Sequence, residues 1–238
     1  MPITPILFKV YDKLVSHKLS SFCTKYGLLP AAQFAYMKCL GCTDAQLSIS
    51  HHLQKFLDTG MESYIVHLYF SGAFDKVIHS GLLFKLKSIG VGGMCAVYLG
   101  RVPLRPYVVV DGATRGWIPI VSGGPQGSVL GPPLFILYTN EMFELVESRL
   151  HAYADDNTLL AVVRMPTDRS AVAASLNRDL ARIQEWCNHW CMILNPNETK
   201  ALVVSRSRTV NPPRGDLVFS VVSIRACPNL DILAWREV

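Results

Sequence analysis

The sequence predicts a mixed α+β fold in which helices pack around one antiparallel sheet. Three observations lead to this fold class. Apolar residues recur at helical spacing in long segments, most clearly over residues 170–190. Short runs rich in β-branched and aromatic residues lie between those segments, for example residues 64–70. Two further apolar runs within residues 151–163 flank Asp155 and Asp156, which is typical of a hairpin with a tight turn.

The composition predicts a folded chain with a substantial core. Half of the 238 residues are apolar and only 17% are charged, with 23 Lys and Arg against 18 Asp and Glu. High hydrophobicity with a net charge of only +5 excludes a mostly disordered chain. The length allows one large domain or two small ones.

The first half of the chain is predicted to alternate helices with strands. Near-helical apolar spacing predicts an opening helix, and Thr43 or Asp44 can cap a second helix that ends near Gly60. The dipeptide Asp111-Gly112 predicts a turn between two strands. In chain order we expect a helix at residues 6–22, a turn at 27–30, a helix at 43–60, a strand at 64–70, a helix at 81–89, and strands at 107–110 and 117–121.

The second half continues the same mixture. Pro132 and Pro133 are tolerated only in the first turn of a helix, so the helix predicted over residues 130–146 begins there. A hairpin follows at residues 151–163, and late strands are predicted at 201–204 and 217–224. The helix predicted at residues 170–190 has one apolar face. This face consists of Val172, Leu176, Leu180, Ile183 and Trp186.

The charge-free run at residues 116–140 is long enough to cross a bilayer, for which about 20 apolar residues suffice. Prolines and glycines interrupt it, and a spanning helix could satisfy few of the backbone groups that they disturb. We therefore expect buried core and no membrane partner. No charged segment followed by a long apolar run opens the chain, so we expect an intracellular protein, nuclear or cytoplasmic, that is not secreted.

An intracellular chain should keep its seven cysteines as thiols. The spacings Cys39-x-x-Cys42 and Cys187-x-x-x-Cys191 could indicate zinc ligands, but the pairs lie far apart in sequence and no further pair completes a set of four. Cys187 and Cys191 also fall beside tryptophans on an apolar helix face, where a free cysteine acts as a small hydrophobic side chain.

The run Tyr153-Ala154-Asp155-Asp156 is the strongest local sign of chemistry. Two adjacent carboxylates at a turn between apolar strands are costly unless something such as a divalent cation neutralises them. The same residues also suit a turn without any ligand, because Asp and Asn tolerate tight-turn geometry.

The loop at residues 122–128 is a second sign, because it is rich in glycine and enters a long apolar helix. Glycines allow a ligand to approach the backbone closely, and a helix N-terminus favours phosphates. An ordinary loop before a helix is the alternative interpretation.

These motifs, in this order and spacing, resemble the reverse transcriptase of non-LTR (LINE-type) retrotransposons, in particular the jockey-like elements of animals. The most specific stretches are Pro125-Gln-Gly-Ser-Val-Leu-Gly131 and Tyr153-Ala-Asp-Asp156. Further matching stretches extend the resemblance over almost the whole chain. They are residues 2–19, 33–47, 70–77 and 194–208.

The resemblance implies a right-hand polymerase fold, with fingers and palm present, an antiparallel palm sheet packed on helices, and a thumb that is largely missing. Residues 1–62 would be mostly fingers, residues 63–205 mostly palm, and residues 206–238 the end of the palm with a truncated thumb connection. It also implies RNA-directed DNA synthesis from an RNA template, a DNA primer and deoxynucleoside triphosphates, with two Mg²⁺ or Mn²⁺ ions.

By the same resemblance, Asp155 matches the main metal ligand of the Tyr-Ala-Asp-Asp hairpin, and Asp156 stands beside it. Phe74 matches the aromatic residue that lies under the sugar and excludes a 2′-hydroxyl. Gln126 and Gly127 match the loop that lines the nucleotide and the template. The implied nucleotide contacts are Phe70, Phe74, Gln126, Gly127, Lys38 and Lys200.

Tyr69 departs from the family pattern, because it stands where the family has the metal-binding aspartate of the first palm strand. A phenol is neutral at pH 7 and is a poor ligand for magnesium. Losing an outer partner of a metal site typically costs about 10–100-fold, so losing a bridging ligand should cost more. We therefore expect polymerase activity to be absent from this chain.

Two further positions depart in the same direction. Met37 occupies the place of a fingers arginine, which leaves Lys38 as the cation there. Glu198 stands at the place of a lysine, where an acid would repel phosphate, and Lys200 is the nearest substitute. The sequence also shows no upstream endonuclease and no full thumb, as expected of a decayed or partial copy.

Two alternatives stay open. The chain could be a non-catalytic module that binds nucleic acid, since the net charge is +5 and a late stretch is basic. A solvated basic loop explains the same stretch. The chain could also be a retroelement fragment without a selected role. The residues of the basic stretch are Lys200, Arg206, Arg208 and Arg214.

Overall fold

The structure is a computed structural model that describes residues 6–92, 109–110, 113–114, 121–123, 127–206, 217–218 and 223–224. The chain divides into two units, and each is built from segments that are separated in sequence. The sheet unit comprises Ala31–Ser71, Met142–His189 and Ile193–Val238. The helical unit comprises Met1–Pro30, Gly72–Glu141 and Trp190–Met192.

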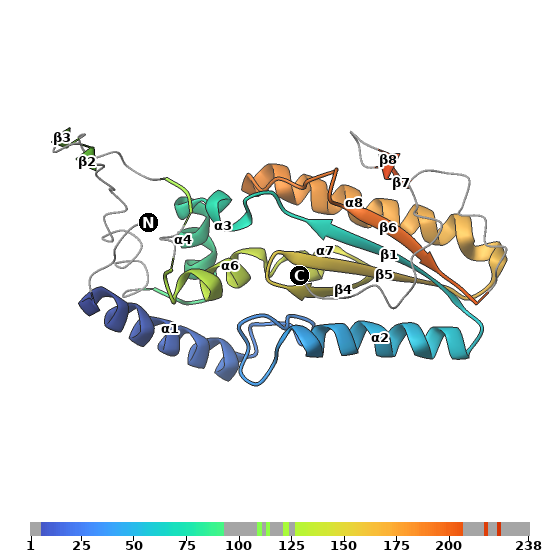
Figure 1. Ribbon diagram of the computed structural model, residues 1–238, viewed down its shortest axis with the longest axis horizontal. Helices are drawn as coiled ribbons and strands as arrows, with labels where there is room; N and C mark the ends of the chain where they lie inside the picture. The colour runs from blue at the N-terminus through green and yellow to red at the C-terminus, as the bar shows by residue number, and fades with distance from the viewer. Residues whose placement is uncertain are drawn as a thin grey trace. The chain divides into compact units, whose positions relative to one another are not determined.

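Four antiparallel strands form the sheet of the sheet unit, in the order β4-β5-β1-β6 (Figure 1). They are β1 (Glu62–Tyr69), β4 (Arg149–Tyr153), β5 (Asp156–Val163) and β6 (Lys200–Val204). β1 lies between two partners and is buried along nearly its whole length, as its β-branched and aromatic residues favour. The mixed fold class, the strand predicted at residues 64–70 and the predicted hairpin are thereby confirmed.

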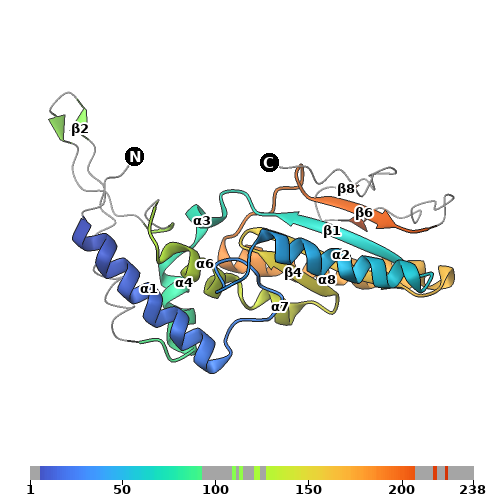
Figure 2. The same cartoon turned by 60° about the horizontal axis from the view of Figure 1, so that its bottom comes forward.

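Helices cover both faces of this sheet. α2 (Cys42–Asp58) packs on the face that carries Ile65, and Figure 2 shows α2 at the front of this unit. α8 (Arg169–Trp190) packs on the opposite face, where the ring of Trp186 contacts that of Phe70. The two faces differ because successive residues of a strand point to opposite sides. The buried residues of α8 are Leu176, Asp179, Leu180, Ile183, Trp186 and Cys187.

The first residues of α2 and the last residues of α8 differ from what the sequence predicted. The N-cap of α2 is Gly41, and the Oδ2 atom of Asp44 accepts its N–H at 2.7 Å, so Asp44 closes the first turn from within the helix. Cys187 is buried in α8, and this burial raises its pKa to about 12. Cys191 lies beyond the end of α8 and is exposed, so its predicted place on the apolar helix face is wrong.

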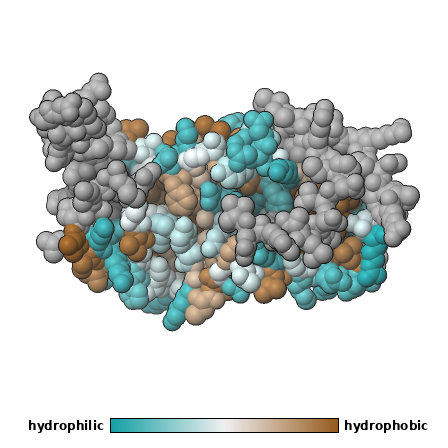
Figure 3. Space-filling model, viewed as in Figure 1, coloured by the Kyte–Doolittle hydropathy of each residue, from teal (hydrophilic) through white to brown (hydrophobic). Residues whose placement is uncertain are grey.

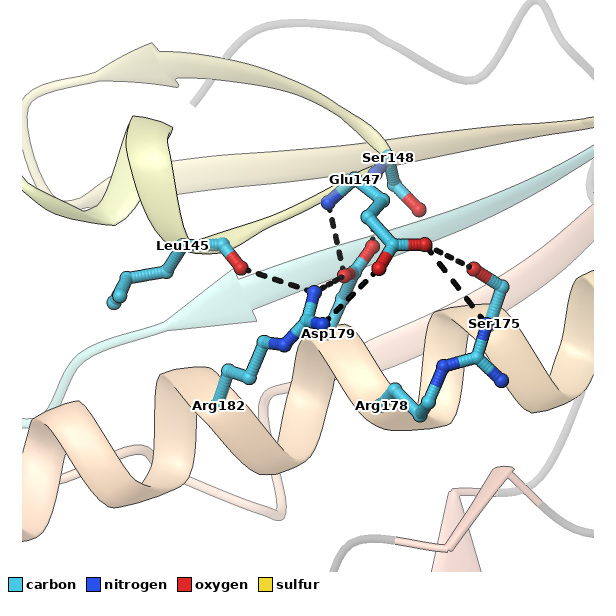
Figure 4. Close-up of polar contacts among 7 residues, drawn as sticks. All are labelled: Leu145, Glu147, Ser148, Ser175, Arg178, Asp179 and Arg182. Carbon is cyan, nitrogen blue, oxygen red and sulfur yellow. Dashed lines mark hydrogen bonds and ion pairs between the residues drawn. The ribbon is translucent and has the colours of Figure 1, made fainter.

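A buried carboxylate fixes the start of β4 to α8 (Figure 4). The Asp179 carboxylate is fully buried and accepts the backbone N–H groups of Glu147, at 2.9 Å, and of Ser148, at 2.8 Å. The guanidinium of Arg182, one turn further along α8, lies 3.4 Å from Asp179 and 3.0 Å from the Glu147 carboxylate. These contacts set the point from which β4 enters the hairpin.

α6 (Gly131–Thr139) is the central helix of the helical unit. Every side chain from Leu134 to Thr139 is buried, which confirms for this segment that the charge-free run is core. α1 (Ile6–Tyr26), α3 (Ala73–Lys76) and α4 (His79–Ser88) pack against α6. Within the described ranges, the structure has no helix that is both long enough and apolar enough to cross a bilayer.

Lys85 of α4 is only 4% exposed. Its Nζ donates to the carbonyl oxygen of Tyr138 at 2.6 Å and to Oε2 of Glu141 at 2.8 Å, and it lies 3.8 Å from the ring centroid of Trp190. Burial lowers the pKa of Lys85, and the bond to Glu141 opposes this shift. The side chain thus joins α4 to the end of α6.

The single helix predicted over residues 130–146 is wrong. α6 ends at Thr139, and α7 (Met142–Leu145) begins after a break. In a continuous helix the Tyr138 carbonyl would accept the N–H of Met142; at the break, this carbonyl accepts a hydrogen bond from the Lys85 ammonium. The Asn140 side chain also donates to the carbonyl of Leu28 at 3.0 Å, which ties the break to the end of α1.

α1 has an apolar side that faces solvent as well as one that faces the core. Val15, Leu19 and Cys23 are buried, whereas Val10 and Leu14 are exposed together with Ile6 at the start of the helix. Figure 3 shows hydrophobic residues gathered at the lower left, over the N-terminal part of α1.

Where longer strands were predicted at residues 107–110 and 217–224, the described residues form short strand pairs. β2 (Val109–Val110) pairs with β3 (Ala113–Thr114), and β7 (Leu217–Val218) pairs with β8 (Ser223–Ile224). The described ends of the segment predicted as one strand at residues 217–224 are therefore two antiparallel strands. Of the strand predicted at residues 117–121, residues 117–120 lie outside the described residues. The 3-10 helix η1 (Pro166–Asp168) precedes α8.

Candidate functional site

The hairpin between β4 and β5 presents two adjacent aspartates at its tip. Tyr153 pairs with Asp156 across the strands, so Ala154 and Asp155 form the turn. Ala154 has a φ of 57°, in the left-handed region, which costs a residue with a Cβ atom roughly 1–2 kcal/mol. Contacts around the turn have to compensate for this cost.

Residues 32–34 follow the edge strand β4 toward this turn. The N–H of Phe34 donates to the carbonyl of Ala152 at 2.9 Å, and the N–H of Ala152 donates to the carbonyl of Ala32 at 2.9 Å. Gln33, between them, is 1% exposed. The sequence interpretation gave Gln33 no role, because a single polar residue in an irregular segment carries no periodic signal.

The structure places Tyr69 at the same tip. Tyr69 ends β1 and pairs with Asp156 of β5. Its carbonyl accepts the N–H of Asn195 at 2.8 Å, and its own N–H donates to Oγ1 of Thr199 at 3.4 Å. Tyr153, Asp156 and Tyr69 therefore lie in one row across three strands, on the same face of the sheet.

The two aspartates at the tip carry uncompensated charge. The pKa of Asp156 is raised, first because neighbouring atoms partly desolvate its carboxyl and second because Asp155 is negative. Burial, then the charge of Asp155 and then Tyr153, raises the pKa of the Tyr36 phenol. Among the residues that the structure describes, neither Asp155 nor Asp156 forms an ion pair.

The residues at this tip do not fit the pair of divalent ions that the resemblance implies. Magnesium favours several hard oxygen ligands, and carboxylates supply most of them in proteins. Tyr69 offers a phenol at the position where the resemblance implies a carboxylate. Within the part of the chain that the structure describes, no three His, Cys, Asp or Glu side chains are grouped so as to hold a metal ion.

Strand register brings one lysine to this face of the sheet. Lys200 begins β6 and pairs with His67, two residues before Tyr69. The pKa of His67 is lowered by burial and then by the charge of Lys200. Glu198 is bound locally instead, because the Nδ2 of Asn195 donates to its Oε1 at 2.7 Å.

The other predicted cations are dispersed. Lys38 is exposed in the segment that leads from Gln33 to α2. Arg206 forms an exposed ion pair with Asp58 at 2.8 Å, while Arg208 and Arg214 lie outside the described residues. The basic stretch is therefore partly engaged within the sheet unit.

Phe70, one of the expected nucleotide contacts, is buried in the sheet unit. Its side chain is 1% exposed and meets the Trp186 ring with 6.4 Å between centroids, so it belongs to the core between β1 and α8. This burial argues against a nucleotide contact. Phe74 belongs to the helical unit, where its ring lies 4.5 Å from that of Phe135.

Gly127 also belongs to the helical unit, and Gln126 lies outside the described residues. Gly127 has a φ of 81°, a conformation that glycine adopts without strain. The residues after it are held by buried Asp12, whose Oδ2 accepts the Ser128 hydroxyl at 2.9 Å and the Val129 N–H at 2.6 Å.

On the other side of this loop, the Nε2 atom of His79 donates to the carbonyl of Gly123 at 2.6 Å. The sequence did not predict roles for Asp12 and His79, because their hydrogen bonds to this loop join residues far apart in the chain.

Comparisons with known proteins agree with this arrangement of motifs. The family described as Reverse transcriptase (RNA-dependent DNA polymerase) matches residues 1–214. The RNA-directed DNA polymerase from mobile element jockey and the probable RNA-directed DNA polymerase from transposon X-element, both of Drosophila melanogaster, are each 30% identical over 89% of this chain. The chain spans 24% of the length of each of these relatives.

Among solved structures, an apo telomerase from Candida Tropicalis, truncated from the C-terminal domain, aligns with a TM-score of 0.49. The alignment has 11% sequence identity and covers 85% of this chain and 42% of the telomerase chain.

Proposed function

The chain belongs to the reverse transcriptase family, and we propose that its polymerase site is inactive because Tyr69 replaces a metal-binding aspartate. The domain resembles the RNA-directed DNA polymerases of non-LTR transposons. In the right-hand arrangement that we propose, residues 1–62 form mostly fingers, residues 63–205 mostly palm, and residues 206–238 the end of the palm with part of a thumb connection.

The pairing of Tyr69 with Asp156 carries this proposal. Hydrogen bonds with Asn195 and Thr199 hold the Tyr69 backbone, and its register against β5 is fixed along the whole strand. A shift in register by one residue would turn its side chain to the other face. Glu62 cannot replace the missing carboxylate, because it lies at the far end of β1 and its Oε1 is 2.6 Å from Arg169.

We propose an RNA template and a DNA primer as the ligands inherited with this fold. Phe74, Gln126, Gly127, Lys38 and Lys200 are the proposed contacts to the nucleotide or the template, and Asp155 and Asp156 are the remaining metal ligands. A bound Mg²⁺ or Mn²⁺ would supply charge stabilisation for phosphoryl transfer, which two carboxylates beside a phenol support poorly. The proposed setting is inside the cell.

Primer extension on an RNA template tests the proposal. The native chain, Tyr69→Asp, Tyr69→Phe and Asp155→Ala are compared for incorporation of labelled deoxynucleotides with Mg²⁺ or Mn²⁺. We expect the native chain and Tyr69→Phe to match the Asp155→Ala blank. We expect Tyr69→Asp to exceed them by at least about 100-fold, the upper range for loss of an outer metal-site partner.

Incorporation by the native chain above the blank would show that the proposal of inactivity is wrong. Failure of all four proteins would show that Tyr69 is not the only defect, and would direct attention to Met37 and Glu198.

A second candidate is a module that binds nucleic acid without catalysis. The exposed Lys200 on the same face as Tyr69, together with the net charge of +5, favours it. Binding of single-stranded RNA that weakens steadily with salt, and that is unchanged in Asp155→Ala, would support this candidate. RNA binding indistinguishable from that of a neutral protein would exclude it.

A further inference from the structure

We infer that Gln33 is a positioning residue for the turn that carries Asp155 and Asp156. The inference deepens the proposed function, because it concerns the same hairpin. It does not require the native chain to synthesise DNA, because the property at issue is the geometry of the turn.

The Gln33 carboxamide joins two segments that are far apart in sequence. Its Oε1 accepts the N–H of Ala35 at 3.0 Å and the N–H of Ala154 at 3.4 Å. The Gln33 backbone forms a parallel bridge with Ala152, and the neighbouring residues hydrogen-bond to Ala152 on both sides. The bridge to Ala152 and the bond to the Ala35 N–H therefore hold Gln33 in place beside the turn.

Ala154 is the residue of the turn that most needs such support. It is buried, it immediately precedes Asp155, and its φ of 57° is unfavourable for a residue with a Cβ atom. The strand pairing of the hairpin joins Tyr153 to Asp156 and leaves Ala154 in the turn. A buried backbone N–H without an acceptor is costly, so the Gln33 oxygen favours the conformation that aims this N–H at it.

The position of the two carboxylates follows from this contact. Asp155 and Asp156 are the next two residues, and a change in the Ala154 dihedral angles would re-aim both. The segment that carries Gln33 also carries Tyr36, whose phenol lies within electrostatic reach of Asp155. Gln33 thus fixes the turn from a segment with no metal ligand of its own.

Amide NMR of the ¹⁵N-labelled full chain tests the inference. Gln33→Met keeps the side-chain length and removes the acceptor, while Gln33→Glu keeps an oxygen at its place. Gln54→Met is the matched control, because Gln54 lies on the exposed side of α2 and bonds only to Asp58 among the described residues. Hydrogen exchange and chemical shifts are followed at Ala154 and, as an internal reference, at Leu159 of β5.

We expect Gln33→Met to speed exchange of the Ala154 amide by about tenfold or more, with Leu159 unchanged. In Gln33→Glu the protection should remain, and the Ala154 amide shift should follow the titration of the introduced carboxyl. Gln54→Met should change neither amide. Should Gln33→Met fail to fold, the titration seen in Gln33→Glu decides the question.

An Ala154 amide chemical shift that does not change as the introduced carboxyl titrates would overturn the inference. Equal acceleration at Ala154 and Leu159 would also overturn it, because the effect would then be a general loss of stability. If Tyr69→Asp restores DNA synthesis, Gln33→Met in that background should lower kcat by about tenfold with little change in KM, as expected for misplaced catalytic ligands. Failure of Tyr69→Asp bears on the proposed function alone, because the NMR result stands without it.

Discussion

His151 should make the sheet unit sensitive to mild acid. The His151 side chain is 4% exposed between β4 and α2, and neither ring nitrogen has a hydrogen-bond partner in the structure. Its ring stacks on Phe34 and lies 5.4 Å from that of His52. Burial, and then the charges of His52 and Arg149, lower the pKa of His151 from 6.5 to about 4.

The sign and size of the effect follow from this pKa. Well above pH 6.5 the ring is neutral in both the folded and the unfolded chain, so His151 adds no pH dependence to the free energy of unfolding. As the pH falls from 6.5 to 4, the unfolded chain takes up a proton that the folded chain refuses, and the free energy of unfolding decreases. The full loss is about 3 kcal/mol, at roughly 1.4 kcal/mol per pH unit.

Urea unfolding followed by circular dichroism at pH 7, 6, 5 and 4 measures this loss. We expect His151→Phe to remove it, because a phenyl ring fills the same buried site and cannot take up a proton. His189→Gln, at an exposed residue of α8, is the matched control and should keep the profile of the native chain. Carboxylates titrate equally in all three proteins, so the difference between profiles isolates His151. Parallel profiles for the native chain and His151→Phe would refute the reasoning.

Three further substitutions test contacts that hold the site in place. Asp179→Ala leaves two backbone N–H groups without their acceptor, so the free energy of unfolding should fall by about 3 kcal/mol in urea titrations. An equally stable variant would contradict the role of this carboxylate. Asp12→Ala should lower the free energy of unfolding by about 2 kcal/mol and should speed hydrogen exchange of the Val129 amide. Unchanged exchange at Val129 would mean that another acceptor replaces Asp12. Lys85→Met should cost about 2 kcal/mol through the lost hydrogen bond to the Tyr138 carbonyl and the lost contact with the Trp190 ring. A neutral result in thermal unfolding would show that packing alone holds α4 to α6.

Local sequence patterns predicted the elements that depend on local physics. The strand at Tyr64 and the helix that carries Leu180 follow from side-chain type and spacing, and the structure contains both. The turn at Asp155 was predicted in the same way, because short polar residues suit tight turns. The family resemblance, rather than any local pattern, directed attention to Tyr69.

Contacts between distant segments were not predictable from such patterns. The helix predicted over residues 130–146 ends at Thr139, next to the point where Lys85, far away in sequence, binds the Tyr138 carbonyl. Gln33 and Asp12 read as ordinary polar residues until the fold places an amide beside each of them. A periodicity reports which face of an element is buried, and it carries no information on which partner that face will meet.

The central place of β1 has a consequence for synthesis of the chain on the ribosome. Tyr69 pairs with Asp156, so β1 is complete about 90 residues before its first partner strand emerges. At a synthesis rate of about 5–20 residues per second, this apolar strand stays without a partner strand on either edge for several seconds. The β4–β5 hairpin closes by a local turn and meets no such delay. Nascent chains of this protein should therefore need a chaperone most while the residues between β1 and β5 are being translated.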